Sequence, residues 1–241
     1  MRASGVLSPS DRKKLKSTII YDIFGARYLL TRDEPSAMRP VVFVHGFLDT
    51  WYMPWWRKMR KHLNSVGAMP DKVYGVNKGS IPGTTVKSPE EYAKLVEAEV
   101  EKVYDRHDER VNVVGHSMGG LDSRWYVEQM GGEDYVETLV TLGTPHHGTL
   151  TSRYAAFTPG GKKLAMSSDI IRTLKKDGVS DDIEYVSVWS PKDRAVKPSR
   201  SAKLPDEFRD NVTNIKVEPF SHVEMLWKKQ VVDEFAPYLR G

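Results

Sequence analysis

Short apolar runs alternate with longer amphipathic stretches along most of this chain. The most apolar runs span only four to seven residues and are rich in β-branched side chains, at 40–44, 111–114, 136–142 and 183–188. Between them, apolar residues recur three or four positions apart, as in helices that pack one face against a core. Strands that are apolar on both faces and separated by helices predict a mostly parallel, doubly wound α/β sheet with helices on both faces.

Capping residues help to place the helices. Ser88 precedes Pro89 and is followed three positions later by Glu91, which predicts the start of a long helix that ends near His107. Further helices are expected over 54–63, 118–130 and 168–174 and from about Val223, and further strands over 72–76 and 214–217.

The first 38 residues are basic and differ in pattern from the rest. Leu15, Ile19 and Ile23 recur four positions apart, which predicts an amphipathic helix that turns into a strand near Ala26–Leu30. We therefore expect an N-terminal extension over 1–38 and a main domain over 39–241. The apolar face of the extension would pack on the main domain, contact a membrane surface or contact a second chain, and the sequence leaves the oligomeric state open.

Composition narrows the range of functions. A chain of 241 residues suits one large domain, and the absence of cysteine excludes disulfides and thiolate chemistry. The net charge of +4 is spread along the chain, so a nucleic-acid partner is not expected. No run approaches the length of a membrane span, and the first residues lack the apolar core of a secretory signal. This favours a cytoplasmic location, or secretion if a leader has been removed.

The strongest chemical signal is the segment Gly115–Gly119, which has the G-x-S-x-G pattern of a nucleophile elbow. An elbow holds its serine, here Ser117, at a sharp turn between a buried strand and a helix. The hydroxyl then stands clear of the sheet, and glycines allow the strand and helix to approach closely. Ser117 is therefore a candidate nucleophile.

A serine nucleophile needs a base and a carboxylate that orients the base. Asp193 follows a predicted strand, and His222 lies between the last predicted strand and the last helix, which matches the order serine, acid, histidine. Asp193 also fits a simple turn, since Ser-Pro-Lys-Asp is good turn chemistry, and Asp181, Asp182 and Glu184 are weaker alternatives. His222 is the candidate base.

Two backbone N–H groups are needed to stabilise the oxyanion that forms on attack. One belongs to the residue after the nucleophile, Met118, and the other to the loop after the first core strand, at Phe47. His45 is interpreted as a residue that shapes this loop, and His116 as structural, with its side chain directed away from the nucleophile.

Five motifs in a fixed order resemble the small bacterial lipases and esterases of the α/β-hydrolase superfamily, lipase class 2 above all. They are Val44–Phe47, Gly115–Arg124, Thr141–Thr149, Ser190–Asp193 and Phe220–His222. The resemblance covers roughly residues 39–240. It implies an α/β-hydrolase fold, Ser117 as nucleophile, Asp193 and His222 as the rest of a triad, and Phe47 and Met118 as oxyanion donors.

The chain departs from the smallest members of that group in its N-terminal extension and in a longer connection over 146–182. No cofactor and no metal ion are expected. Asp177–Asp182 is a poor calcium loop, and the pair His146-His147 belongs to a loop signature of the family.

Aromatic residues near the candidate nucleophile are candidates for substrate binding. Trp51 and Tyr52 follow the oxyanion loop and would line an acyl pocket or its mouth, whereas Trp56 is expected in the core. Tyr154 and Phe157 lie in the long connection, which is either a mobile lid or a fixed packing element. Apolar lining of this kind suits an acyl chain better than a charged metabolite.

These patterns predict a serine carboxylic-ester hydrolase that cleaves lipid-like or shorter acyl esters through an acyl-enzyme. A thioesterase, acyltransferase, amidase or polyester depolymerase would use the same residues. A ligand receptor without turnover is the alternative from another class, since a fold alone does not fix function.

Overall fold

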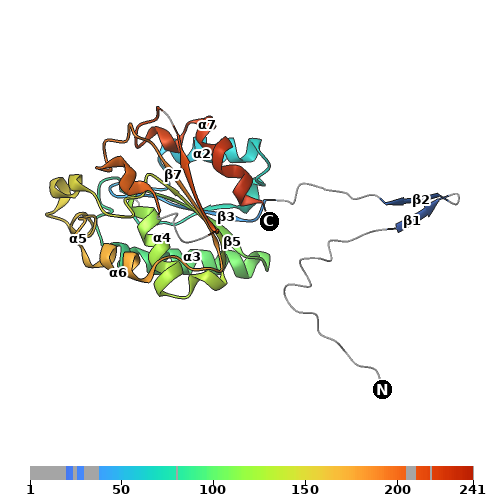
Figure 1. Cartoon of the computed structure of the whole chain (residues 1–241), viewed down its shortest axis with the longest axis horizontal. Coiled ribbons are helices and arrows are strands. Elements are labelled where there is room, and N and C mark those ends of the chain that lie inside the picture. The colour runs from blue at the N-terminus through green and yellow to red at the C-terminus, as the bar shows by residue number, and fades with distance from the viewer. Residues whose placement is uncertain are drawn as a thin grey trace, which may run out of the picture. The chain divides into compact units, whose positions relative to one another are not determined.

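The structure is a computed structural model that describes residues 20–23, 26–29, 38–79, 81–204, 210–217 and 219–240 (Figure 1). The chain divides into two compact units, Met1–Ser36 and Ala37–Gly241. We describe each unit by itself.

The described part of the first unit is a two-stranded antiparallel sheet of β1 (Ile20–Ile23) and β2 (Ala26–Leu29). The expectation of a helix is therefore wrong for these residues, although β2 lies where a strand was expected. Tyr21 pairs with Tyr28, and β-branched and aromatic residues of this kind favour strands. Leu15 and Ile19, which completed the helical pattern, lie outside the described residues.

A six-stranded parallel sheet forms the centre of the second unit, with the strand order β4-β3-β5-β6-β7-β8. The strands are β3 (Val41–Val44), β4 (Val73–Gly75), β5 (Val111–His116), β6 (Val136–Leu142), β7 (Glu184–Trp189) and β8 (Val212–Lys216). The predicted mostly parallel sheet is confirmed.

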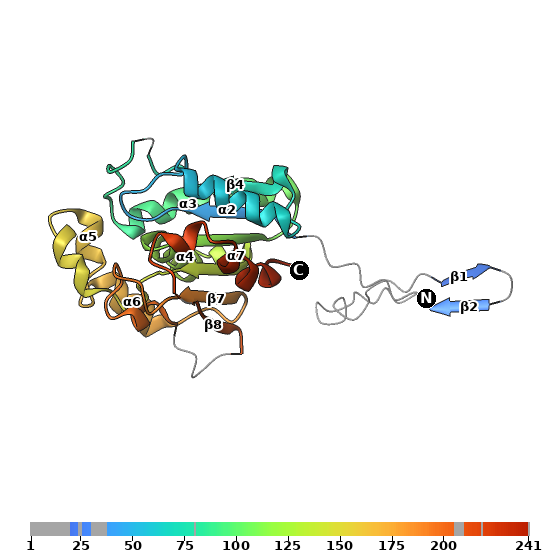
Figure 2. The ribbon, with the colours of Figure 1, turned by 90° about the horizontal axis from the view of Figure 1, so that it is seen from above.

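Helices cover both faces of this sheet because successive strand residues point in opposite directions. Val41 and Phe43 pack into one cluster with α2 (Pro54–Ser65) and α7 (Lys229–Phe235). Val42 and Val44 pack into another with α3 (Pro89–His107) and α4 (Met118–Gln129). Figure 2 shows the layers from above.

The connection between β6 and β7 contains α6 (Asp169–Asp177), and the remaining helical segments are shorter. They are α5 (Pro159–Lys163) and the 3₁₀ turns Pro70–Lys72, Gly132–Asp134, Leu150–Ala155, Ser199–Ala202, Glu224–Leu226 and Ala236–Leu239. The closing helix thus starts at Lys229, and Val223 leads into a 3₁₀ turn instead. Within the described ranges, no helix has the length and apolar character needed to cross a membrane.

The strand order reverses at β3, which has β4 on one side and β5 on the other. The chain segments that leave the carboxyl ends of β3 and β5 therefore diverge, and a crevice forms between them at the point where ligands of such sheets bind. Ser117 and the loop that begins at His45 both lie there.

Candidate active site

Ser117 occupies the turn between β5 and α4 with φ 54° and ψ −124°. A positive φ is uncommon for a residue other than glycine and persists only where the surroundings enforce it. Gly119 permits the start of α4 to lie against the end of β3, because a Cβ atom there would lie 2.3 Å from the carbonyl oxygen of Val44. The sequence pattern thus forms a strained elbow with its serine at the tip.

His222 and Asp193 are hydrogen-bonded to each other. His222 Nδ1 lies 2.7 Å from Oδ2 of Asp193, whose side chain is buried. The other carboxylate oxygen of Asp193 accepts the backbone N–H groups of Ala195 at 2.8 Å and Val196 at 3.1 Å. This carboxylate is fixed at both oxygens, so it holds the imidazole with Nδ1 protonated and leaves Nε2 as a base.

The loop after β3 lies directly against the elbow. A Cβ atom on Gly46 would lie 3.0 Å from Cβ of Ser117. Met118 begins α4, and neither its N–H nor that of Phe47 donates a hydrogen bond to any residue the structure describes. Two N–H donors are therefore free beside the serine, which is what an oxyanion site requires.

A buried ion pair contacts the loop after β3. Lys78 Nζ lies 2.6 Å from Oδ2 of Asp122, and neither side chain is exposed to solvent. The same ammonium donates to the carbonyl oxygen of His45 and lies 4.8 Å from the centroid of the Tyr92 ring. Burial raises the pKa of Asp122, and the charge of Lys78 opposes that rise. Sequence reasoning missed both residues, because nothing in the spacing links positions 78 and 122.

Two further histidines surround the site and are neutral. Burial lowers the pKa of His45 to about 3 and that of His116 well below its usual value. His116 Nε2 lies 3.1 Å from the carbonyl oxygen of His222, so it must be the protonated nitrogen. From the sequence, His116 is interpreted as structural, with its side chain directed away from the nucleophile. Its contact with the His222 backbone agrees with a structural role, although the residue lines the same pocket as Ser117.

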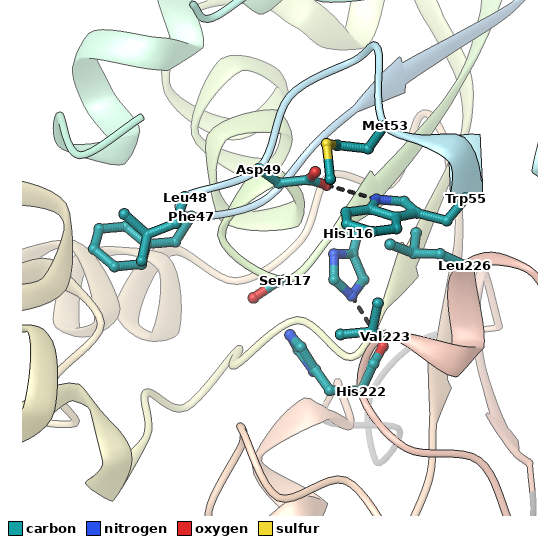
Figure 3. Close-up of a pocket in the computed structure, with 10 residues that line it drawn as sticks. All are labelled: Phe47, Leu48, Asp49, Met53, Trp55, His116, Ser117, His222, Val223 and Leu226. Carbon is teal, nitrogen blue, oxygen red and sulfur yellow. Dashed lines mark hydrogen bonds between the residues drawn. The ribbon is translucent and has the colours of Figure 1, made fainter. Parts of the chain in front are cut away.

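Ser117 opens into a pocket of about 190 Å³. Figure 3 shows the hydroxyl of Ser117 and the ring of His222 directed into it. Apart from His116, the other lining residues are mostly apolar: Phe47, Leu48, Asp49, Met53, Trp55, Val223 and Leu226. The Asp49 carboxylate is engaged by the indole N–H groups of Trp55 at 3.2 Å and Trp56 at 2.9 Å and by the N–H of Thr50.

The four predicted substrate-binding residues do not line this pocket. Trp51 and Tyr52 border a separate depression, where Trp51 packs on Phe43 and lies under the guanidinium of Arg60. Tyr154 and Phe157 are 70% and 84% exposed. Met53, which caps α2, and Trp55, in its first turn, line the pocket instead.

The connection 146–182 contains one helix that is well packed. Ile170, Ile171 and Leu174 of α6 are buried beside Met118. Arg124 of α4 donates to the carbonyl oxygens of Leu174 and Gly178 at the end of α6. These contacts are those of a packing helix, and a mobile lid stays a prediction for the more exposed segment Leu150–Lys163.

Histidines in this connection have protein partners. His146 is buried, with Nε2 at 3.0 Å from Oγ1 of Thr141 and Nδ1 at 3.4 Å from Arg124. Across the described residues, no group of three or more histidines and carboxylates is arranged to hold a metal ion.

The parallel sheet, the elbow and the order of the loops define an α/β-hydrolase, which confirms the predicted fold and the resemblance. The sequence model of the palmitoyl protein thioesterase family matches residues 40–184, more than half of the chain. The chain belongs to that family.

Named relatives and solved structures agree with this placement. Triacylglycerol lipases of Pseudarthrobacter phenanthrenivorans and Burkholderia plantarii are each 33% identical over 115 residues, 46% of this chain. The match covers 34% and 30% of those proteins, so it spans about a third of their length. The crystal structure of the mature Bacillus licheniformis lipase BlEst2 superposes with a TM-score of 0.69 at 19% identity, over 87% of this chain and 95% of that one, which supports the fold.

Proposed function

We propose that this protein is a serine carboxylic-ester hydrolase in which Ser117, Asp193 and His222 form the catalytic triad. The observation that carries the proposal is the 2.7 Å contact between His222 Nδ1 and the buried Asp193 carboxylate, because His222 lines the same pocket as the elbow serine. Relatives that are triacylglycerol lipases support the same class of reaction.

The proposed reaction has two halves. Ser117 Oγ attacks the ester carbonyl while His222 Nε2 takes its proton, and Asp193 stabilises the imidazolium that results. The N–H groups of Phe47 and Met118 bind the oxyanion of the tetrahedral intermediate. The C–O bond then breaks as His222 returns the proton to the leaving alcohol. Water, activated by the same histidine, releases the acid from the acyl-enzyme.

The pocket favours short acyl groups. Its volume of about 190 Å³ lies below the roughly 300–1,000 Å³ of pockets that enclose drug-sized ligands. Phe47, Met53, Trp55 and Leu226 supply an apolar lining. We therefore expect the highest kcat/KM for acetyl to hexanoyl esters and a decline for longer chains, which would extend beyond the pocket into solvent.

Hydrolysis of 4-nitrophenyl esters from acetate to palmitate tests the reaction, with Ser117→Ala alongside. We expect kcat to fall about 10⁴–10⁶-fold in the variant. Equal rates in both proteins would reject the triad. Labelling of Ser117 by a fluorophosphonate without ester hydrolysis would indicate another acyl donor, such as that of an acyltransferase or a polyester depolymerase. Neither labelling nor hydrolysis would favour a receptor.

A thioesterase is the second candidate, because the matching family model is that of palmitoyl protein thioesterases. The same serine would attack a thioester carbonyl, and a thiolate leaves without needing full protonation by His222. Paired oxygen and sulfur esters of one acyl group separate the two activities. A higher kcat/KM for the sulfur ester, beyond the ratio of the uncatalysed rates, would assign the thioesterase.

A further inference from the structure

A second cavity lies beside the pocket of Ser117. Its volume is about 410 Å³, and its lining consists of Lys192, Arg194, Ala195, Ser221, His222 and Val223. His222 and Val223 also line the pocket of Ser117, so the two cavities adjoin at the histidine. The pocket of Ser117 is lined mostly by apolar side chains, whereas the lining of the second cavity includes the cationic side chains of Lys192 and Arg194.

The two cations are available to a ligand. Lys192 and Arg194 flank Asp193 in the loop after β7, and both are exposed. Asp193 forms no ion pair with either cation, and its oxygens are engaged by His222 and by the N–H groups of Ala195 and Val196. Neither cation forms an ion pair with a carboxylate elsewhere in the described part of the chain.

Besides Asp193, Glu224 is the acidic residue nearest in sequence to this lining. Its Oε2 accepts the N–H of Ser221 at 2.9 Å and the hydroxyl of Ser221 at 2.7 Å. The other carboxylate oxygen lies 3.9 Å from Nζ of Lys228. Glu224 also interacts electrostatically with Lys192. The three basic residues Lys192, Arg194 and Lys228 outnumber the two acidic residues Asp193 and Glu224, so the surroundings of the cavity are net positive.

We propose that this cavity is a subsite for the leaving group, and that it selects acyl esters whose alcohol or thiol carries a carboxylate or phosphate. The inference rests on the proposed function, in which His222 delivers a proton to the departing atom. The leaving group must therefore pass along His222, whereas the acyl group occupies the apolar pocket of Phe47, Met53 and Trp55. An anion on the leaving group meets Lys192 and Arg194, and Arg binds both carboxylate and phosphate in a bidentate manner.

The expected preference is moderate because both cations are exposed. Each exposed ion pair contributes little binding free energy. We therefore expect a gain in kcat/KM of up to about fivefold for one pair and roughly tenfold for two. Salt screens such charges with a Debye length of about 10 Å at 0.1 M, so the preference should shrink at 0.5 M NaCl. The gain should appear mainly in KM, since the charge is bound in the ground state and transition state alike.

A matched pair of butyrate esters tests this inference. One is 4-nitrophenyl butyrate, and the other is the butyrate ester of 5-hydroxy-2-nitrobenzoic acid, the same phenol with an added carboxylate. We expect wild type to favour the charged ester about tenfold in kcat/KM at low salt, after correction for the uncatalysed rates. The double variant Lys192→Ala/Arg194→Ala should lose this ratio, and Lys175→Ala/Lys176→Ala on α6, with the same change in net charge, should keep it.

The outcomes separate the inference from the proposed function. Failure to hydrolyse even the neutral ester would count against the proposed function. Hydrolysis of both esters with a ratio near one, or a ratio unchanged in Lys192→Ala/Arg194→Ala, would overturn the subsite. Butyryl coenzyme A and a butyryl glycerol phosphate then distinguish the source of the anion. The substrate whose kcat/KM falls more in Lys192→Ala/Arg194→Ala identifies the leaving group whose anion the cavity binds.

Discussion

The ring of His116 packs against that of His222, with centroids 4.5 Å apart, and its Nε2 donates to the His222 carbonyl oxygen at 3.1 Å. The residue before the elbow serine thus supports the histidine 106 positions later in the chain. One strand end therefore fixes both the serine and the backbone of its proposed base.

Loss of this contact should slow catalysis more than it affects binding. A hydrogen bond contributes about 0.5–1.5 kcal/mol, so we expect His116→Leu to lower kcat roughly three- to tenfold with little change in KM. His116→Gln, which keeps an amide donor, should recover part of the loss. Titration of active serines with a fluorophosphonate corrects kcat for misfolded protein. An unchanged corrected kcat in His116→Leu would show that the contact does not position His222.

Asp193→Asn should impair catalysis severely without disturbing the fold. The amide nitrogen either faces the protonated Nδ1 of His222 or faces the N–H groups of Ala195 and Val196, and both arrangements oppose two donors. The wrong histidine tautomer is then favoured, and we expect kcat to fall about 10³–10⁴-fold. Stopped-flow or steady-state ester hydrolysis measures the effect, and circular dichroism checks the fold. A near-normal rate would mean that another carboxylate orients His222.

The buried pair Lys78–Asp122 allows stability and catalysis to be separated. Lys78→Met leaves Asp122 buried and unpaired, which should reduce the free energy of unfolding by about 3–5 kcal/mol. Lys78→Met/Asp122→Leu removes both charges and should restore most of that loss. Because the donor to the His45 carbonyl is still missing, the double variant should remain slower in kcat than wild type. Denaturant unfolding and ester hydrolysis on the same samples test both statements.

A double variant that regains both stability and rate would contradict the role assigned to Lys78 in positioning the oxyanion loop. The matched control is Lys72→Met, because Lys72 pairs with Glu109 at the partly exposed end of the sheet. Its loss should cost less than about 1 kcal/mol.

Much of the architecture could be predicted because the strands are buried on both faces. Each is a short apolar run, and the capping box of Ser88 and Glu91 places the start of α3 at Pro89 as expected. Ser117 and His222 could be located because a nucleophile elbow and its base occupy set positions along an α/β chain. Their assignment to a triad remains a proposal.

The lining of the pocket could not be predicted from the same patterns. The candidates are all large side chains: Trp51, Tyr52, Met53 and Trp55. The orientation of α2, which begins at Pro54, sets which of them face the pocket, and a short loop has no periodic pattern that would predict this orientation. The N-terminal pattern was misleading because a spacing of four residues fits two structures. It places side chains on one face of a helix, and it also places them on one face of a strand, where every second residue shares a face. The structure forms the strand Ile20–Ile23.

Buried histidines should make the protein less stable in acid. Burial lowers the pKa of His45, His116 and His146, whereas histidine in an unfolded chain titrates near 6.5. Below that pH the unfolded state binds more protons than the folded state. The free energy of unfolding is therefore highest above about pH 6.5 and decreases as the pH falls. Each group contributes up to about 1.4 kcal/mol per pH unit.

His146→Gln should weaken the dependence of the free energy of unfolding on pH between pH 6.5 and 5 by the contribution of one histidine, as measured by urea unfolding at several pH values. The half-buried His147, whose pKa burial lowers less, provides a graded comparison, and His147→Gln should change the slope by a smaller amount. Identical slopes in wild type and His146→Gln would show that His146 is protonated in the folded protein.

Gly143, at the end of β6, is a further position where the structure demands glycine. Its φ is +56°, and a Cβ atom there would lie 3.0 Å from both Oδ2 of Asp193 and Nδ1 of His222, and 2.7 Å from Cε of Met225. Gly143→Ala should therefore push apart the two atoms of the Asp193–His222 hydrogen bond. We expect kcat to fall at least about 100-fold, because a misplacement on the order of 1 Å has that cost.

Gly131→Ala is the matched control for backbone strain. Gly131 also has a positive φ, +78°, but a Cβ atom there would meet nothing within 4 Å. Both variants should lose similar stability from the unfavourable φ, on the order of 1 kcal/mol, and Gly143→Ala somewhat more from its contacts. Only Gly143→Ala should lose activity per folded molecule. Equal specific activities in the two variants would mean that the Asp193–His222 contact tolerates displacement, and would weaken its assignment as the core of the site.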